Sequence, residues 1–160
     1  MRRSRPHGCW DHLLAAPLWV AYKTNLGTLL RTCDAVGACM AVPDSPHYRE
    51  ALTIGDSRRL GRRTCVHWLR QGKDGWIAER RAEGWRIVAV ELAEGATALP
   101  RLEPARSRTI VLLGHETQGV PDHLVAEADE CVEIPMVGRG ASLNVAVAGS
   151  LVLYRLAGLA

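Results

Sequence analysis

The sequence has 160 residues, of which 48% are hydrophobic and 23% are charged. This length suits one domain with a proper core and is too short for two, and the composition excludes a disordered or fibrous chain. The formal net charge is +3, and the 20 basic residues are all arginine except Lys23 and Lys73. Arginine suits bidentate phosphate contacts, although a GC-rich genome would produce the same bias.

The cysteines and histidines indicate no metal site. The five cysteines are odd in number and form no CxxC or ligand-spaced pair, which argues against both a disulfide framework and a zinc site and favours a reducing cytoplasm. The six histidines show no ligand spacing either. No signal-peptide pattern opens the chain, and the C-terminal apolar run, interrupted by Asn144 and Arg155, predicts a buried helix.

Short apolar runs alternate with helical patterns along the chain. Strands are predicted over 17–22, 38–43, 64–69, 85–92, 109–114 and 131–136, and helices over 25–36, 47–55, 74–84, 121–128 and the C-terminal apolar run. A polar loop containing Pro100 and Pro104 interrupts the alternation. We expect a single α/β domain over 1–160, with a parallel sheet flanked by helices on both faces and a flexible basic tail over 1–12.

Three glycine-bearing segments fall at predicted strand ends or helix starts, where parallel sheets bind ligands. They are "KTNLGTLLRT" from Lys23, "LLGHETQGVP" from Leu112 and "IPMVGRGASLNV" from Ile134. None contains GxGxxG or GxxxxGK[ST], so dinucleotide and nucleoside triphosphate fingerprints are excluded.

Each segment carries one or two polar side chains with more than one interpretation. Glu116 follows a buried strand and can either bind a ligand or brace neighbouring loop N–H groups. Ser142 and Asn144 suit a helix start, where Ser142 caps the helix and both side chains face a ligand, or where they are only a cap and a satisfied polar group. Arg31 either pairs with Asp34 or binds a phosphate.

In this order and at these separations, the stretches "NLGTLLRTCDAVGA", "VLLGHETQGVPDHLVAEAD" and "IPMVGRGASLNVAVAGSLVLY" resemble the three motifs of the SpoU/TrmH family of SPOUT-class RNA 2'-O-ribose methyltransferases. The resemblance spans roughly 18–154 and implies a parallel sheet whose C-terminal part forms a deep trefoil knot. It also implies that the protein binds S-adenosylmethionine (SAM) and completes its site as a homodimer.

The same resemblance implies roles for individual residues. Arg31, Asn25, Ser142, Asn144 and Glu116 match the family's catalytic positions. The cofactor would contact Leu113, Gly114, His115, Glu116, Ile134, Met136, Ser142 and Leu143. Arg31 is usually assigned as the base, but guanidinium groups remain charged in ordinary surroundings. We therefore expect Arg31 to reach the site of the partner subunit, bind a phosphate there and stabilise the alkoxide, and to accept the proton only if the closed site depresses its pKa strongly.

The substrate is expected to be transfer RNA rather than ribosomal RNA, because the chain carries little beyond the catalytic domain. Candidate RNA contacts are Arg31, the tail arginines and the cluster "RRLGRR", which comprises Arg58, Arg59, Arg62 and Arg63. This cluster is equally explained as a solvated turn. Alternatives are a ribosomal RNA methyltransferase, a non-catalytic RNA-binding relative, and a small-molecule enzyme with a nucleotide cofactor.

Overall fold

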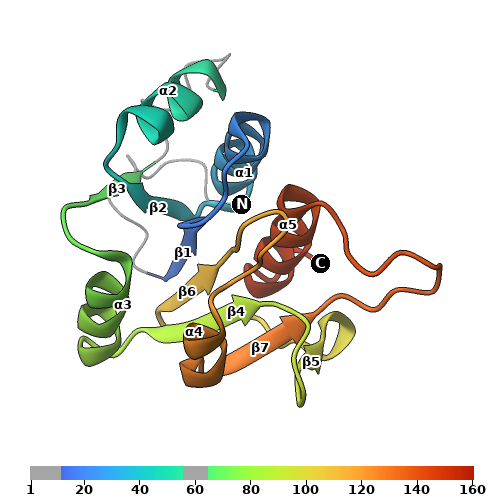
Figure 1. Ribbon diagram of the computed structural model, residues 1–160. Coiled ribbons are helices and arrows are strands. Elements are labelled where there is room, and N and C mark those ends of the chain that lie inside the picture. Colours follow the sequence, from blue (N-terminus) through green and yellow to red (C-terminus); the bar gives the residue numbers. More distant parts are fainter. Residues whose placement is uncertain (1–11, 56–64) are drawn as a thin grey trace.

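The computed structural model describes residues 12–55 and 65–160, which form a seven-stranded sheet in the order β3-β2-β1-β6-β4-β7-β5 (Figure 1). Every strand pairing in this sheet is parallel. The strands are β1 (Leu13–Ala16), β2 (Cys39–Pro43), β3 (Val66–Leu69), β4 (Arg86–Val90), β5 (Thr97–Ala98), β6 (Thr109–Leu112) and β7 (Glu130–Glu133).

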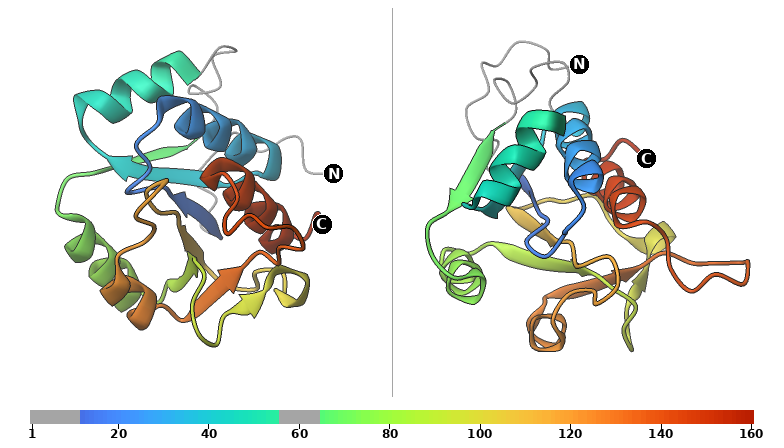
Figure 2. Two further views of the ribbon diagram at one scale, coloured as in Figure 1. Left: turned by 45° about the vertical axis from the view of Figure 1, so that its right-hand side comes forward. Right: turned by 45° about the horizontal axis from the view of Figure 1, so that its top comes forward.

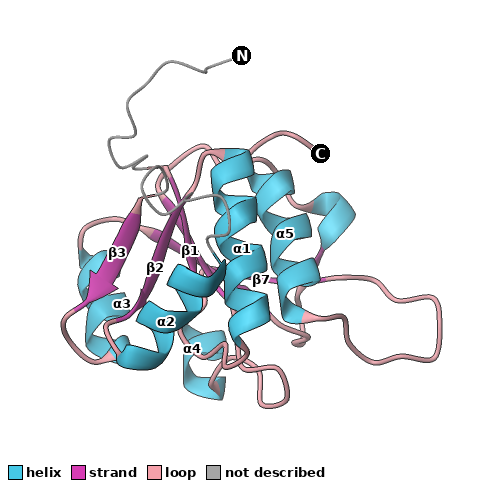
Figure 3. Cartoon of the chain, turned by 90° about the horizontal axis from the view of Figure 1, so that it is seen from above, coloured by secondary structure: helices cyan, strands magenta, loops and turns pink. Residues whose placement is uncertain are grey.

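Helices cover both faces of the sheet, as the alternation of strands and helices predicts (Figures 2 and 3). They are α1 (Lys23–Val36), α2 (Pro46–Gly55), α3 (Lys73–Ala82), α4 (Asp122–Glu127) and α5 (Val145–Leu156), with a 3-10 turn over Leu99–Arg101. Because the central strands are covered on both sides, β1 and β6 are buried along their whole length. The predicted α/β class with a parallel sheet is therefore confirmed.

Two apolar layers hold the helices to the sheet. Leu29 and Leu30 of α1 pack with Val152 and Leu153 of α5 on one face. Trp76 and Ile77 of α3 and Leu124 of α4 pack on the opposite face. The site-bearing helices α1 and α5 therefore share one face and lie side by side (Figure 3).

Two elements differ from the sequence prediction. The first strand covers Leu13–Ala16, whereas 17–22 is a loop. Pro17 cannot donate to a ladder, and the Leu18 N–H turns back to the Ala16 carbonyl at 2.9 Å. The predicted polar loop holds the two-residue strand β5, which pairs with β7, and the 3-10 turn that follows.

The C-terminal apolar run forms α5, but only one face of that helix is buried. Val147, Leu151 and Tyr154 remain 49%, 42% and 37% exposed, so the predicted buried helix is buried on one face and exposed on the other. In the described ranges, no helix is long and apolar enough to cross a bilayer. The expected trefoil knot stays a prediction, and most of the expected 1–12 tail lies outside the described residues.

Candidate functional site

The three glycine-bearing segments meet at the carboxyl edge of the sheet. The first segment lies in α1, which the loop after β1 leads into, the second follows β6, and the third joins β7 to α5. Their polar side chains come from parts of the sequence that are 91 and 119 residues apart. The fold therefore brings together residues whose proximity no local pattern shows.

Glu116 is the centre of a hydrogen-bond network. Its carboxylate accepts the backbone N–H groups of Ala21 at 3.0 Å and Tyr22 at 2.9 Å. It also accepts the Asn25 side-chain amide at 3.0 Å. Glu116 therefore braces the loop that precedes α1, which is one of the two roles that the sequence left open.

Asn144 extends the network to α5. Its Nδ2 donates to Asn25 Oδ1 at 3.0 Å, and its Oδ1 accepts the N–H groups of Ala146 and Val147 at 2.8 and 3.2 Å. Asn144 is therefore the N-cap of α5. The prediction that Ser142 caps this helix is wrong, because α5 begins at Val145 and Ser142 lies exposed in the preceding loop.

The network favours the charged form of Glu116. Burial raises the pKa of this carboxyl group, but the donors from Tyr22, Ala21 and Asn25 together lower the pKa below its ordinary value of 4.5. Glu116 is thus an ionised acceptor near neutral pH, and its charge is committed to the loop donors. This arrangement suits a positioning role.

The loop after β6 turns so tightly that it requires glycine. A Cβ atom on Gly114 would lie 2.2 Å from the Gly119 carbonyl carbon, and Gly119 has a φ of +71°. Glu91, just after β4, accepts the Val120 N–H at 3.0 Å and fixes the far side of the loop. Sequence reasoning missed Glu91, because the predicted strand 85–92 includes this residue, whereas β4 ends at Val90.

Two residues at the start of α2 support the loop after β1. The Tyr48 hydroxyl donates to the carbonyls of Leu18 at 3.0 Å and Val20 at 2.9 Å, while His47 Nε2 lies 2.7 Å from the Ala21 carbonyl. Burial, with a smaller contribution from the charge of Glu116, raises the pKa of Tyr48 to about 12. Tyr48 is therefore a neutral donor that sets the shape of the loop.

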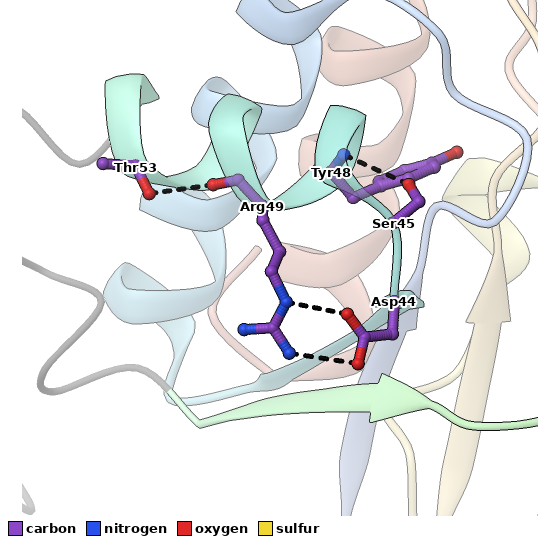
Figure 4. A network of polar contacts seen from close by, with 5 residues as sticks. All are labelled: Asp44, Ser45, Tyr48, Arg49 and Thr53. Atoms are coloured by element: carbon purple, nitrogen blue, oxygen red, sulfur yellow. Dashed lines mark hydrogen bonds and ion pairs between the residues drawn. The ribbon is translucent and has the colours of Figure 1, made fainter.

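The start of α2 is itself stabilised by side chains from the preceding turn (Figure 4). Arg49 Nε and Nη2 bind the two oxygens of Asp44 at 2.7 and 3.1 Å, and the Tyr48 N–H donates to Ser45 Oγ at 3.4 Å. The position of Tyr48 against the loop after β1 is thereby held from outside the site.

Arg31 lies apart from this network. It is exposed on α1, whereas Asn25 is buried, and it sits about 9 Å further along the helix axis. Among the described residues it forms no ion pair with Asp34, so that interpretation is wrong. The Arg31 side chain is available to a group outside its own chain.

The predicted cofactor residues are divided between two environments. Leu113 and Gly114 are buried, and His115 is half-buried in the tight loop after β6. Met136 and Leu143 are each 39% exposed on the segment between β7 and α5, which projects from the body (Figures 1 and 2). Ile134, at the base of that segment, is half-buried.

An open pocket of about 650 Å³ lies between the loop after β1, the start of α2 and the loop after β6 that carries Glu116. Its lining includes Trp19, His47, Lys73 and His115. Lys73 Nζ is 5.7 Å from the centre of the Trp19 ring, and burial lowers the pKa of Lys73 more than Asp74 raises it. Sequence reasoning missed this pairing of a cation with an aromatic ring, because it joins separate elements.

The predicted RNA-binding cluster Arg58, Arg59, Arg62 and Arg63 lies outside the described residues. The structure therefore places Asn25, Glu116 and Asn144 in one network, leaves Arg31 and Ser142 exposed nearby, and spreads the predicted cofactor residues over two loops.

Comparison with known proteins identifies the family to which this site and fold correspond. Residues 19–154 match the SpoU rRNA Methylase family. The chain is 32% identical over 137 residues to the mouse tRNA (guanosine(18)-2'-O)-methyltransferase TARBP1, which covers 82% of this chain and 8% of that protein. It is 30% identical over 146 residues to the Bacillus subtilis 23S rRNA (guanosine(2553)-2'-O)-methyltransferase RlmP, covering 84% and 53%.

Solved structures share the fold. The AdoMet-bound rRNA methyltransferase from Sinorhizobium meliloti superimposes with a TM-score of 0.76 at 28% identity, over 91% of this chain and 55% of that one. The chain thus spans only part of the length of these relatives.

Proposed function

Because this chain belongs to the SpoU rRNA Methylase family, we propose that it is a SAM-dependent RNA 2'-O-ribose methyltransferase. The observation that carries the proposal is the hydrogen-bonded chain Glu116–Asn25–Asn144, which joins all three motif segments at the edge where parallel sheets bind ligands. The mouse relative is named for 2'-O-methylation of transfer RNA and the Bacillus subtilis relative for the same reaction on ribosomal RNA.

The residues present fit SAM. The exposed Met136 and Leu143 offer apolar surface for an adenosine. We assign Leu113, Gly114, His115, Glu116, Ile134, Met136, Ser142 and Leu143 to hold it. When bound, SAM would supply an electrophilic methyl group.

The chain's own residues would position the reaction. Glu116, Asn25 and Asn144 hold the three loops in register, and such positioning can supply about 7 to 11 kcal/mol of a barrier in favourable cases. Arg31 would bind the phosphate next to the target ribose and stabilise the developing alkoxide. The ribose 2'-hydroxyl would release its proton to solvent as its oxygen takes the methyl group from the sulfonium, which would leave as a neutral thioether.

A homodimer would place Arg31 at a partner's site. Val147, Leu151 and Tyr154 recur at helical spacing on the exposed face of α5, which packs against α1, and the exposed Arg31 lies on that neighbouring helix. Covering this stripe with a second copy would bury it and bring the two Arg31 side chains to the interface.

The proposed substrate is transfer RNA, the RNA for which the mouse relative is named. Lys73 and Trp19 in the pocket beside the Glu116 loop supply a cation and a stacking surface for RNA, alongside Arg31 and the arginine cluster 58–63. Ribosomal RNA is the second candidate, favoured by the Bacillus subtilis relative. The cysteine composition supports a cytoplasmic location.

The test is transfer of labelled methyl from SAM to total RNA of a strain lacking the protein, with mass spectrometry of the nucleosides. A 2'-O-methylated nucleoside in the transfer RNA fraction is expected, and one in the ribosomal fraction would select the second candidate. SAM binding without transfer to any fraction would indicate a non-catalytic relative. Binding of NAD or ATP in place of SAM would refute the proposal.

A further inference from the structure

Two cysteines and a histidine meet at the amino ends of β2 and β3. The register pairs Met40 with Val66 and Ala41 with His67, and the Met40 N–H donates to the Cys65 carbonyl at 2.9 Å. Because side chains alternate along a strand, Cys39, Cys65 and His67 all point to the sheet face that α3 covers. These two strands lie side by side at the edge of the sheet (Figure 3).

The three side chains are close enough to share one ion. One ligand atom from each lies within 4.8 Å of the others. In tetrahedral zinc sites, with Zn–S near 2.3 Å and Zn–N near 2.0 Å, ligand atoms are about 3.5 to 3.8 Å apart. The ligand atoms would have to move closer together by up to roughly an ångström to complete that geometry.

We propose that Cys39, Cys65 and His67 bind one Zn²⁺ ion, with water as the fourth ligand. On binding, each thiol releases its proton to solvent, and the two thiolates neutralise the charge of the ion. Such neutrality is what a site with a buried Cys39 and half-buried Cys65 and His67 requires. Arg80 of α3 acts electrostatically on His67, and its own charge is offset by Glu79 and Glu83 at 3.3 and 3.2 Å.

This site is separate from methyl transfer. Cys39 opens β2 and Cys65 directly precedes β3, whereas Glu116 and Asn144 follow the carboxyl ends of β6 and β7. The ion would join β2 to β3 at the end of the sheet opposite to the Glu116 network. The zinc proposal therefore does not depend on the proposed methyltransferase function. Sequence spacing predicted no zinc site because Cys39 reaches the other two ligands only through the parallel register.

The test is the zinc content of the full chain after dialysis against a chelator and reloading with Zn²⁺ alone. Wild type is expected to retain one zinc per chain, and Cys65→Ser and His67→Ala to bind it more than about tenfold more weakly. Cys131→Ser is the matched control, since that half-buried thiol donates to the Val125 carbonyl outside the cluster. It should bind zinc as wild type does.

A second readout uses the unmodified protein, so it does not depend on variants folding. Zn²⁺ should slow alkylation of Cys65, read by peptide mass spectrometry, while leaving Cys131 unchanged. Cobalt substitution should give the absorption bands of thiolate-bound tetrahedral Co²⁺. Wild type without retained zinc and without protection of Cys65, or variants that bind zinc as tightly as wild type, would overturn the proposal.

Discussion

At the scale of single residues, the site depends on a carboxylate that touches backbone rather than one poised for proton transfer. Glu116 directs its charge to the N–H groups of Ala21 and Tyr22 and to the Asn25 amide. Arg31, by contrast, is exposed and outside that network. Substitution of Glu116 should therefore lower stability, whereas substitution of Arg31 should lower methyl transfer.

Glu116→Gln should lower the free energy of unfolding by about 1 kcal/mol at pH 7, because charge-assisted bonds to three donors in a half-exposed site are weakened. Its pKa is depressed in the folded state, so its contribution is present above pH 4.5 and is lost as pH falls through the lower folded value. Urea unfolding of both proteins at pH 7 and near pH 3 measures this. A difference that persists undiminished at the acid pH would contradict the expectation, and Glu94→Gln, at an exposed site, is the control.

Arg31→Lys should reduce methyl transfer by about a hundredfold or more while leaving SAM affinity unchanged, because a point charge does not reproduce the planar fork of guanidinium. Single-turnover assays with transfer RNA, together with calorimetric titration of SAM, measure the two effects. Arg101→Lys, another exposed arginine, provides the comparison. Full activity in the Arg31 variant would rule out both phosphate binding and alkoxide stabilisation by this side chain.

At the scale of elements, the sequence predicts most helices and strands because apolar periodicity and turn residues are local signals. It misplaces β1, since "PLWVAY" has strand-like composition and only the backbone of Pro17 and Leu18 reveals a turn. It finds Asn25, Glu116 and Asn144 through motif resemblance but assigns the cap of α5 to Ser142. The bond from Asn144 to Asn25, 119 residues apart, follows from tertiary structure alone.

Asn144 both caps α5 and donates a hydrogen bond to Asn25, and the variant Asn144→Ser can separate these two roles. Serine caps a helix about as well as asparagine, so the stability of α5 should change by less than about 0.5 kcal/mol. Its shorter side chain loses the bond to Asn25, so methyl transfer should fall at least tenfold. Thermal unfolding and the transfer assay are compared on the same preparation. Unchanged methyl transfer in this variant would mean that capping is the whole role of Asn144.

Gly114→Ala should disrupt the loop after β6, since its new Cβ would meet the Gly119 backbone at 2.2 Å and neither chain segment can rotate away. We expect loss of SAM binding and destabilisation of about 2 kcal/mol or more. Gly75→Ala is the matched control, because a Cβ there meets nothing within 4 Å inside α3 and should stabilise by about 0.5 to 1 kcal/mol. Titration calorimetry and urea unfolding distinguish them, and wild-type affinity in Gly114→Ala would refute the tight-turn account.

At the scale of the whole molecule, the chain presents one face with an apolar stripe and one edge with a polar network. Val147, Leu151 and Tyr154 on α5 are exposed in the single chain. The helix beside them carries Arg31. In a symmetric homodimer, the contact that buries the stripe would also bring Arg31 of each subunit to the site of its partner. Loss of the dimer would therefore leave both sites incomplete.

Leu151→Glu should convert the protein to monomers and reduce methyl transfer, because a carboxylate at the centre of the stripe would be buried without a partner. Size-exclusion chromatography with light scattering gives the mass. Leu92→Glu is the control, as Leu92 is 73% exposed on the loop after β4 and lies outside the stripe. Identical dimeric masses for wild type and Leu151→Glu would show that the stripe on α5 is not the dimer interface.

The chain order of the network also fixes when the site can exist during synthesis. Asn25 is synthesised early, Glu116 much later, and Asn144 only when the start of α5 is translated, so the complete network cannot form before that point. In the same way, β1 cannot pair with β6 until β6 has been synthesised. If methyl transfer depends on this network, as we propose, a chain that ends before Asn144 should be inactive.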